Sequence, residues 1–61
     1  MYTLLIADDE ADERALIVFL LKSYPESFHI LEASNGREAL SVLQRGRVDI
    51  LLSDIQMPFL N

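Results

Sequence analysis

Residues 48–58 read VDILLSDIQMP, and this stretch decides the fold that we expect. Its apolar run Ile50-Leu51-Leu52 predicts a buried strand over Val48–Ser53. The strand ends on a single carboxylate, Asp54, and Met57-Pro58 marks a turn shortly after it. The sequence therefore raises the question of why so apolar a strand ends on an acid.

The same arrangement of an apolar strand followed by acids occurs near the start of the chain, where Asp8 and Asp9 follow the first predicted strand. Strands and helices alternate between these two stretches, which predicts βαβαβ order and an α/β fold with a parallel sheet. The first and third strands are almost entirely apolar, as is typical of strands covered on both faces, whereas the mixed second strand is expected at an edge. The expected elements are strands Tyr2–Ala7, Phe28–Ala33 and Val48–Ser53, and helices Ala11 to about Tyr24 and Arg37 to about Arg45.

Both predicted helices carry signals at their ends. Asp12 and Glu13 lie in the first turn of the first helix, where negative charge interacts favourably with the helix dipole. Ser34 or Asn35 is expected to cap the N-terminus of the second helix. Gly46 follows the last residue of that helix, where a glycine commonly ends it.

The first helix is more apolar than docking on one sheet face requires, because residues 15–21 are apolar without interruption. We expect one stripe to pack on the sheet. The other is expected to pack against further helices of a larger fold, to be a scattered set of exposed residues, or to form a surface for a partner. The sheet-facing stripe consists of Leu16, Ile17, Leu20 and Leu21, and the second stripe of Ala15, Val18 and Phe19.

The composition excludes several classes of protein. The 61 residues carry a formal net charge of -5, which argues against nucleic-acid contact by these residues, because phosphates require a basic surface. There is no Cys, so disulfides are excluded; this fits a reducing compartment, and we expect a cytoplasmic protein. No apolar run approaches the roughly 20 residues of a membrane span. The acids after Ala7 do not fit a signal peptide.

Three carboxylates are expected at one rim of the sheet. The C-terminal ends of parallel strands share one edge, so Asp8 and Asp9 would lie near Asp54 if the first and third strands are neighbours. Close carboxylates repel one another unless one is protonated or a cation is bound. All-oxygen ligands suit a hard cation such as Mg²⁺ or Ca²⁺. A carboxylate beside such a cation can act as a nucleophile towards a phosphoryl group.

Three segments resemble the receiver domain of two-component response regulators. These segments are LLIADDE (4–10) with Arg14 one turn on, ASNGREAL (33–40) and DILLSDIQMP (49–58). The resemblance covers residues 1–61 but only the N-terminal half of the family's domain. It implies a flavodoxin-like, doubly wound parallel sheet, here partial, with strand order 2-1-3 and the later strands and helices missing.

The resemblance also implies a role for each matching residue. By the family pattern, Asp54 is the phosphoacceptor, and Asp8, Asp9, Asp54 and the backbone carbonyl of Gln56 bind Mg²⁺. The donor would be a sensor histidine kinase or a phosphotransfer protein. The signal would pass to an output domain that regulates transcription, and DNA contact would belong to that domain. Such a domain is regulatory and is not an enzyme.

The family's later Ser or Thr and its Lys have no counterpart before Asn61. We therefore expect a fragment, the ordered part of a longer molecule, or a truncated product. The alternative function is a phosphorylation-incompetent interaction module that forms a homo-oligomer through an exposed sheet edge or the first helix. An aspartate-nucleophile phosphatase fits less well, because Gln56 stands where those enzymes place a second Asp.

Overall fold

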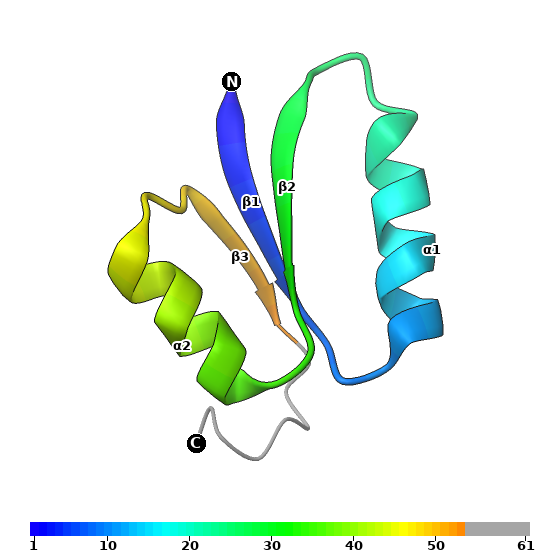
Figure 1. The fold of residues 1–61 in the computed structure, drawn as a ribbon. Helices are drawn as coiled ribbons and strands as arrows, with labels where there is room; N and C mark the ends of the chain where they lie inside the picture. The colour runs from blue at the N-terminus through cyan, green and yellow to red at the C-terminus, as the bar shows by residue number, and fades with distance from the viewer. Residues whose placement is uncertain (54–61) are drawn as a thin grey trace.

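A computed structural model describes residues 1–53, which form a three-stranded parallel sheet with two helices (Figure 1). The strand order is β2-β1-β3, so the predicted α/β class, parallel sheet and 2-1-3 order are confirmed. In this three-stranded sheet β2 is an edge strand, as predicted. The elements are β1 (Tyr2–Ala7), α1 (Ala11–Lys22), β2 (Phe28–Ala33), α2 (Gly36–Arg45) and β3 (Ile50–Ser53).

The central strand β1 is the most buried part of the molecule. Side chains alternate along a strand, so Leu4 and Ile6 point to one face of the sheet and Leu5 and Ala7 to the other. All four are at most 2% exposed, which shows that both faces of β1 are covered. On the second face, Leu5 and Ala7 pack with residues of β2 and α2; this core consists of Leu5, Ala7, Ala33 and Ala39, with Leu31, Val42 and Val48 against it.

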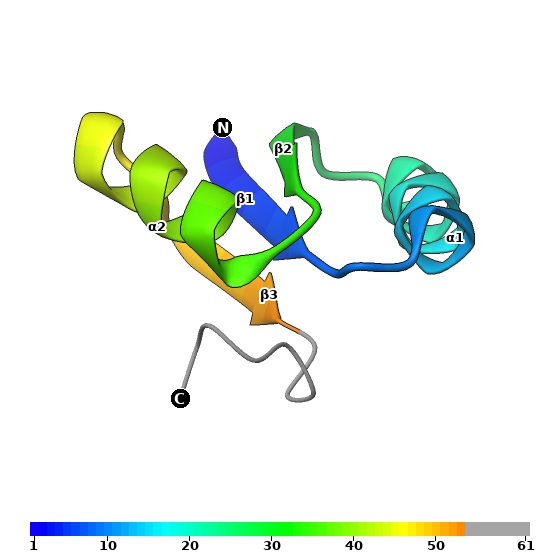
Figure 2. The ribbon, with the colours of Figure 1, turned by 60° about the horizontal axis from the view of Figure 1, so that its bottom comes forward.

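The two helices lie on opposite sides of the sheet (Figure 2). The helix α2 packs on β1 and β2 through Ala39, and α1 packs on β2. This is the doubly wound arrangement, because the connection to β2 and the connection to β3 cross the sheet in opposite directions. Within residues 1–53, neither helix is long and apolar enough to cross a membrane.

The third strand differs from the prediction in length and in burial. It begins at Ile50 because Asp49 interrupts the regular ladder: its carboxylate Oδ2 accepts the Thr3 backbone N–H at 2.8 Å. The Asp49 N–H in turn donates to the Thr3 carbonyl at 2.8 Å. The burial on both faces that the apolar pattern favours is not found for β3 in the described residues, since Leu51 is 42% exposed and Leu52 40%. The reason is that α2 packs on β1 and β2 and leaves β3 at the edge. The exposed sheet edge expected where the later strands are missing is confirmed for this strand.

The side of α1 that faces the sheet also differs from the prediction. Leu16 and Leu20 are 58% and 52% exposed, although the predicted stripe placed them against the sheet. The partly buried positions of α1 follow the spacing i, i+3, i+4, i+7 and therefore share one face. The first of these positions also makes polar contacts with Asp8 and Glu32. The partly buried residues are Arg14, Ile17, Val18 and Leu21.

The ends of the helices agree with the prediction to within two residues. The first helix ends at Lys22 rather than near Tyr24, because the Ser23 and Tyr24 N–H groups bond three residues back, to Leu20 and Leu21. The second begins at Gly36, one residue early. Gly46 follows it as predicted, but with φ of -140° it is extended, so it does not use the left-handed conformation that favours glycine.

Candidate functional site

The candidate site lies at the C-terminal edge of the sheet, where β1 and β3 end side by side. Ala7 is the register partner of Ser53 on one side and of Ala33 on the other. In the sequence, Asp8 follows Ala7 and Asp54 follows Ser53. This confirms that the first and third strands are adjacent, as the site hypothesis requires.

Asp8 is the one buried charged residue among those described, at 4% exposure. Its backbone N–H donates to the Ala33 carbonyl at 3.0 Å, which continues the pairing of β1 with β2 by one residue. Its carboxylate Oδ1 accepts the Glu10 backbone N–H at 2.9 Å, a local turn of the kind that Asp favours. The backbone and the carboxylate of Asp8 are thus both held in place, while Asp9 beside it is exposed.

Arg14 contacts the loop that carries these acids. Its Nη1 donates to the Asp8 carbonyl oxygen at 2.7 Å, and its Nε donates to Glu32 Oε1 at 3.2 Å. The Arg14–Glu32 ion pair joins α1 to β2 across the first crossover. Only 18% of the Arg14 side chain is exposed, against 48% for Glu32, so the guanidinium is less accessible to water than the carboxylate of the pair.

The described residues supply only part of the predicted metal site. Within residues 1–53 no group of three or more His, Asp or Glu side chains is placed to hold a metal ion. Asp54 and Gln56, the other predicted ligands, lie outside the described residues. Asp8 and Asp9 nevertheless fit Mg²⁺ chemically, because this ion is commonly bound by one or two protein carboxylates and completes its shell with water and phosphate oxygens.

The turn that leads into α2 lies next to the same edge and is tightly bonded. Asn35 caps the helix by accepting the Glu38 N–H at 2.8 Å, which confirms one of the two predicted caps. Glu38 Oε1 accepts both the backbone N–H and the hydroxyl of Ser34 at 2.8 Å. Those two Ser34 hydrogen bonds, with a smaller contribution from the Arg14 charge, lower the pKa of Glu38 from its ordinary value.

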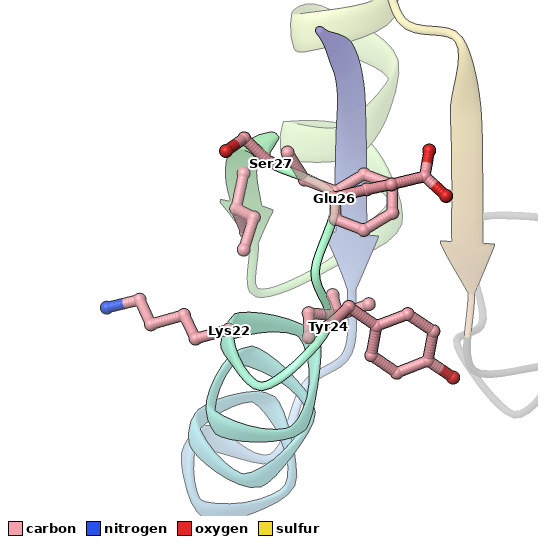
Figure 3. Close-up of a pocket in the computed structure, with 7 residues that line it drawn as sticks. Lys22, Tyr24, Glu26 and Ser27 are labelled. Atoms are coloured by element: carbon pink, nitrogen blue, oxygen red, sulfur yellow. The ribbon is translucent and has the colours of Figure 1, made fainter.

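A surface pocket of about 390 Å³ lies away from the acids, at the end of the sheet where β2 begins (Figure 3). Its walls come from the end of α1, the following loop and the start of β2. None of the residues that line this pocket is one of the predicted site residues. The lining residues are Leu21, Lys22, Tyr24, Glu26, Ser27, Phe28 and Ile30.

A comparison with known protein families assigns the chain to one of them. The model of the response regulator receiver domain matches residues 4–61. The chain belongs to this receiver family. A receiver domain is a regulatory part of two-component signalling, and its family supports a phosphoacceptor role.

Proteins similar to this receiver carry the domain within different longer chains. The autoinducer 1 sensor kinase/phosphatase LuxN of Vibrio campbellii is 39% identical over 97% of the chain, and response regulator GtcR of Aneurinibacillus migulanus is 39% identical over 97%. A protein-glutamate methylesterase/protein-glutamine glutaminase of Rhodospirillum centenum is 35% identical over 98%. The chain spans only 7%, 24% and 15% of these relatives. No solved structure matches it significantly.

Two polar contacts do not follow from the sequence pattern. Glu32, which the pattern places in a mixed strand, accepts a hydrogen bond from Arg14 beside the site. Asp49 lies at the opposite end of the sheet, where its carboxylate accepts the Thr3 N–H at the start of β3. The position of Glu32 directly before the end of β2 was the available signal, since polar residues there approach the functional edge.

Proposed function

We propose that residues 1–61 form the N-terminal half of a receiver domain and that Asp54 accepts a phosphoryl group in the presence of Mg²⁺. The observation that carries this proposal is the parallel register of β1 and β3, in which Ala7 and Ser53 are partners. Each of these residues directly precedes one of the proposed acids, Asp8 or Asp54. The receiver family match over residues 4–61 supports the same assignment.

The proposed cation ligands are Asp8, Asp9, Asp54 and the Gln56 backbone carbonyl. Bound Mg²⁺ would neutralise negative charge on the phosphoryl oxygens near these carboxylates. The chain's own contribution is to present Asp8 in a fixed geometry: burial, the Glu10 N–H and the Ala33 carbonyl all restrict it. Asp9, which is exposed, is accessible from solvent.

The proposed reaction is a nucleophilic phosphoryl transfer. One carboxylate oxygen of Asp54 forms a bond to phosphorus, and the bond from phosphorus to the donor breaks. With a phosphohistidine donor the broken bond is P–N; the imidazole nitrogen keeps the electron pair. With an acyl phosphate the broken bond is P–O, and the carboxylate leaves with the pair.

The proposed donor is a phosphohistidine on a sensor kinase or a phosphotransfer protein, and the proposed output is a further domain that regulates transcription. A cytoplasmic location would give the receiver access to both. The printed names of two relatives, a sensor kinase/phosphatase and a response regulator, support placement in such a relay. The printed name of the methylesterase relative gives no support for a transcriptional output.

The proposal is tested by intact-mass spectrometry of the full chain after incubation with Mg²⁺ and a small acyl phosphate. We expect the mass to rise by one phosphoryl group, and we expect Asp54→Asn to abolish the rise. Asp49→Asn is a matched control on the same stretch, because the amide oxygen can still accept the Thr3 N–H. Uptake that persists unchanged in Asp54→Asn would exclude Asp54 as the acceptor.

A second candidate function is self-association without phosphorylation. It is favoured by the exposure of β3 and of one face of α1, where Phe19 is 71% exposed. If this is the function, light scattering should show an oligomer of the full chain that Phe19→Glu or Leu51→Lys dissociates, since charge opposes both helix docking and edge pairing. A monomer that takes up phosphoryl would exclude this candidate.

A further inference from the structure

Arg14 contacts both ends of the acidic loop, residues 8–10, through its backbone and its side chain. Its backbone N–H donates to the Glu10 carbonyl at 3.0 Å, which forms the first turn of α1. Its side chain reaches back over the same loop, and Nη1 donates to the Asp8 carbonyl at 2.7 Å. The segment from Asp8 to Glu10 is therefore held between the main chain and the side chain of a single residue.

The bond to the Asp8 carbonyl controls the direction of the following residue as well. The Asp8 carbonyl oxygen and the Asp9 N–H belong to one planar peptide unit, so fixing the oxygen fixes the plane from which Asp9 extends. The Asp8 N–H and carboxylate are already bonded to the Ala33 carbonyl and the Glu10 N–H. With the Arg14 bond, the backbone N–H, the carbonyl oxygen and the carboxylate Oδ1 of Asp8 each have a hydrogen-bond partner.

The contacts of Arg14 require a guanidinium group. Nη1 and Nε donate to two acceptors on different elements, the Asp8 carbonyl and Glu32, and the planar fork holds both donors in a fixed relation. The short bond from a charged donor is of the stronger kind. A lysine ammonium has the charge but not the fork, so it cannot reproduce this pair of contacts with the same geometry.

We propose that Arg14 is a positioning residue that sets the geometry of the Asp8–Asp9 segment for cation binding, with Glu32 orienting its guanidinium. This inference rests on the proposed function, in which Asp8 and Asp9 are ligands of Mg²⁺. Geometry and charge predict opposite effects here. The positive charge of Arg14 repels a nearby cation, whereas its hydrogen bonds orient the carboxylates that bind the cation.

Calorimetric titration of the full chain with Mg²⁺ separates the two effects. We expect Arg14→Lys and Arg14→Gln both to weaken Mg²⁺ binding, by roughly tenfold, the usual scale for residues that orient metal ligands. Arg47→Gln is the matched control, because it removes one positive charge from an exposed residue near the opposite end of the sheet. Unchanged Mg²⁺ affinity in both Arg14 variants, or tighter binding in Arg14→Gln, would overturn the proposal.

Amide hydrogen exchange without metal gives an independent readout. In Arg14→Gln we expect faster exchange at Glu10, whose N–H donates to the Asp8 carboxylate, while Leu5 in β1 keeps its protection. Faster exchange at Leu5 as well would show general destabilisation in place of a positioning role, and unchanged exchange at Glu10 would also exclude that role. If the wild-type chain binds no Mg²⁺ but the exchange result is as expected, the proposed metal site fails and the role of Arg14 in the loop stands.

Discussion

Replacing Leu5 by Ala should remove a large part of the stability of the chain. Leu5 is completely buried between β2 and α2, where it packs in the core with Ala33 and Ala39. Buried Leu→Ala changes cost about 3 kcal/mol, from lost burial and from the cavity left behind. A chain of 61 residues is expected to have a free energy of unfolding of roughly 3–9 kcal/mol, so this loss is a large fraction of the total.

Leu40→Ala is the matched control, because it makes the same chemical change on the exposed side of α2. Leu40 is 54% exposed, so less than half of the about 2 kcal/mol available from burying a leucine is lost, that is, under about 1 kcal/mol. Urea denaturation of the full chain, followed by circular dichroism, gives both free energies. If Leu5→Ala unfolds the chain completely, Leu5→Val, at about 1 kcal/mol, keeps the comparison measurable. Equal losses for the Leu5 and Leu40 variants would refute the assignment of this core.

Three further predictions concern polar contacts at the ends of elements. The hydrogen bonds from Ser34 lower the pKa of Glu38 in the folded chain. The stability that the Glu38 carboxylate contributes is therefore present above its unfolded pKa and is lost as the pH falls through its folded pKa. Glu38→Gln should reduce the dependence of the free energy of unfolding on pH in the acid range, measured by urea denaturation. Asn35→Ala should cost about 1 kcal/mol in the same assay, because the Glu38 N–H loses its cap; an unchanged urea midpoint would count against the cap. Asp49→Ala should speed amide exchange at Thr3, whereas Asp49→Asn should not.

The order and type of the elements followed from the sequence because each residue pattern had a single interpretation. The apolar run Tyr2–Ala7 and the mixed segment Phe28–Ala33 had clear boundaries, and both strands were predicted to the residue. The helix cap at Asn35 followed from side-chain chemistry. The strand order 2-1-3 came from the family resemblance rather than from the pattern.

The rotation of α1 could not be predicted in the same way. Residues 15–21 are all apolar, so the apolar pattern alone does not choose which side faces the sheet. The partly buried face includes Arg14, a charged residue that sequence patterning would place in solvent, but which is only 18% exposed and donates to two acceptors. Hydrophobic patterning therefore left open a feature that includes a long-range polar contact.

The candidate site was predictable as a location but not in its details. Asp8 and Asp9 were found because acids that directly follow an apolar strand reach the edge of a parallel sheet. Asp54 and Gln56 remain predictions, since both lie outside the described residues. The Asp8 N–H bonds to the Ala33 carbonyl, a backbone contact that no residue type in the sequence indicates. The bond from the Glu10 N–H to the Asp8 carboxylate is of a kind that Asp favours, but the sequence alone does not show that it forms.

The central position of β1 has a consequence for folding during synthesis. This strand precedes both of its partners in the chain: Tyr2 pairs with Phe28, 26 residues later, and Leu4 with Ile50, 46 residues later. At roughly 5–20 residues per second, the ribosome leaves the most buried strand of the fold without its first partner for about 1–5 s. The helix α1 can form during that interval because its hydrogen bonds are local. Slower translation across residues 11–27 would lengthen the exposure of β1, and it should increase the amount of nascent chain bound by chaperones.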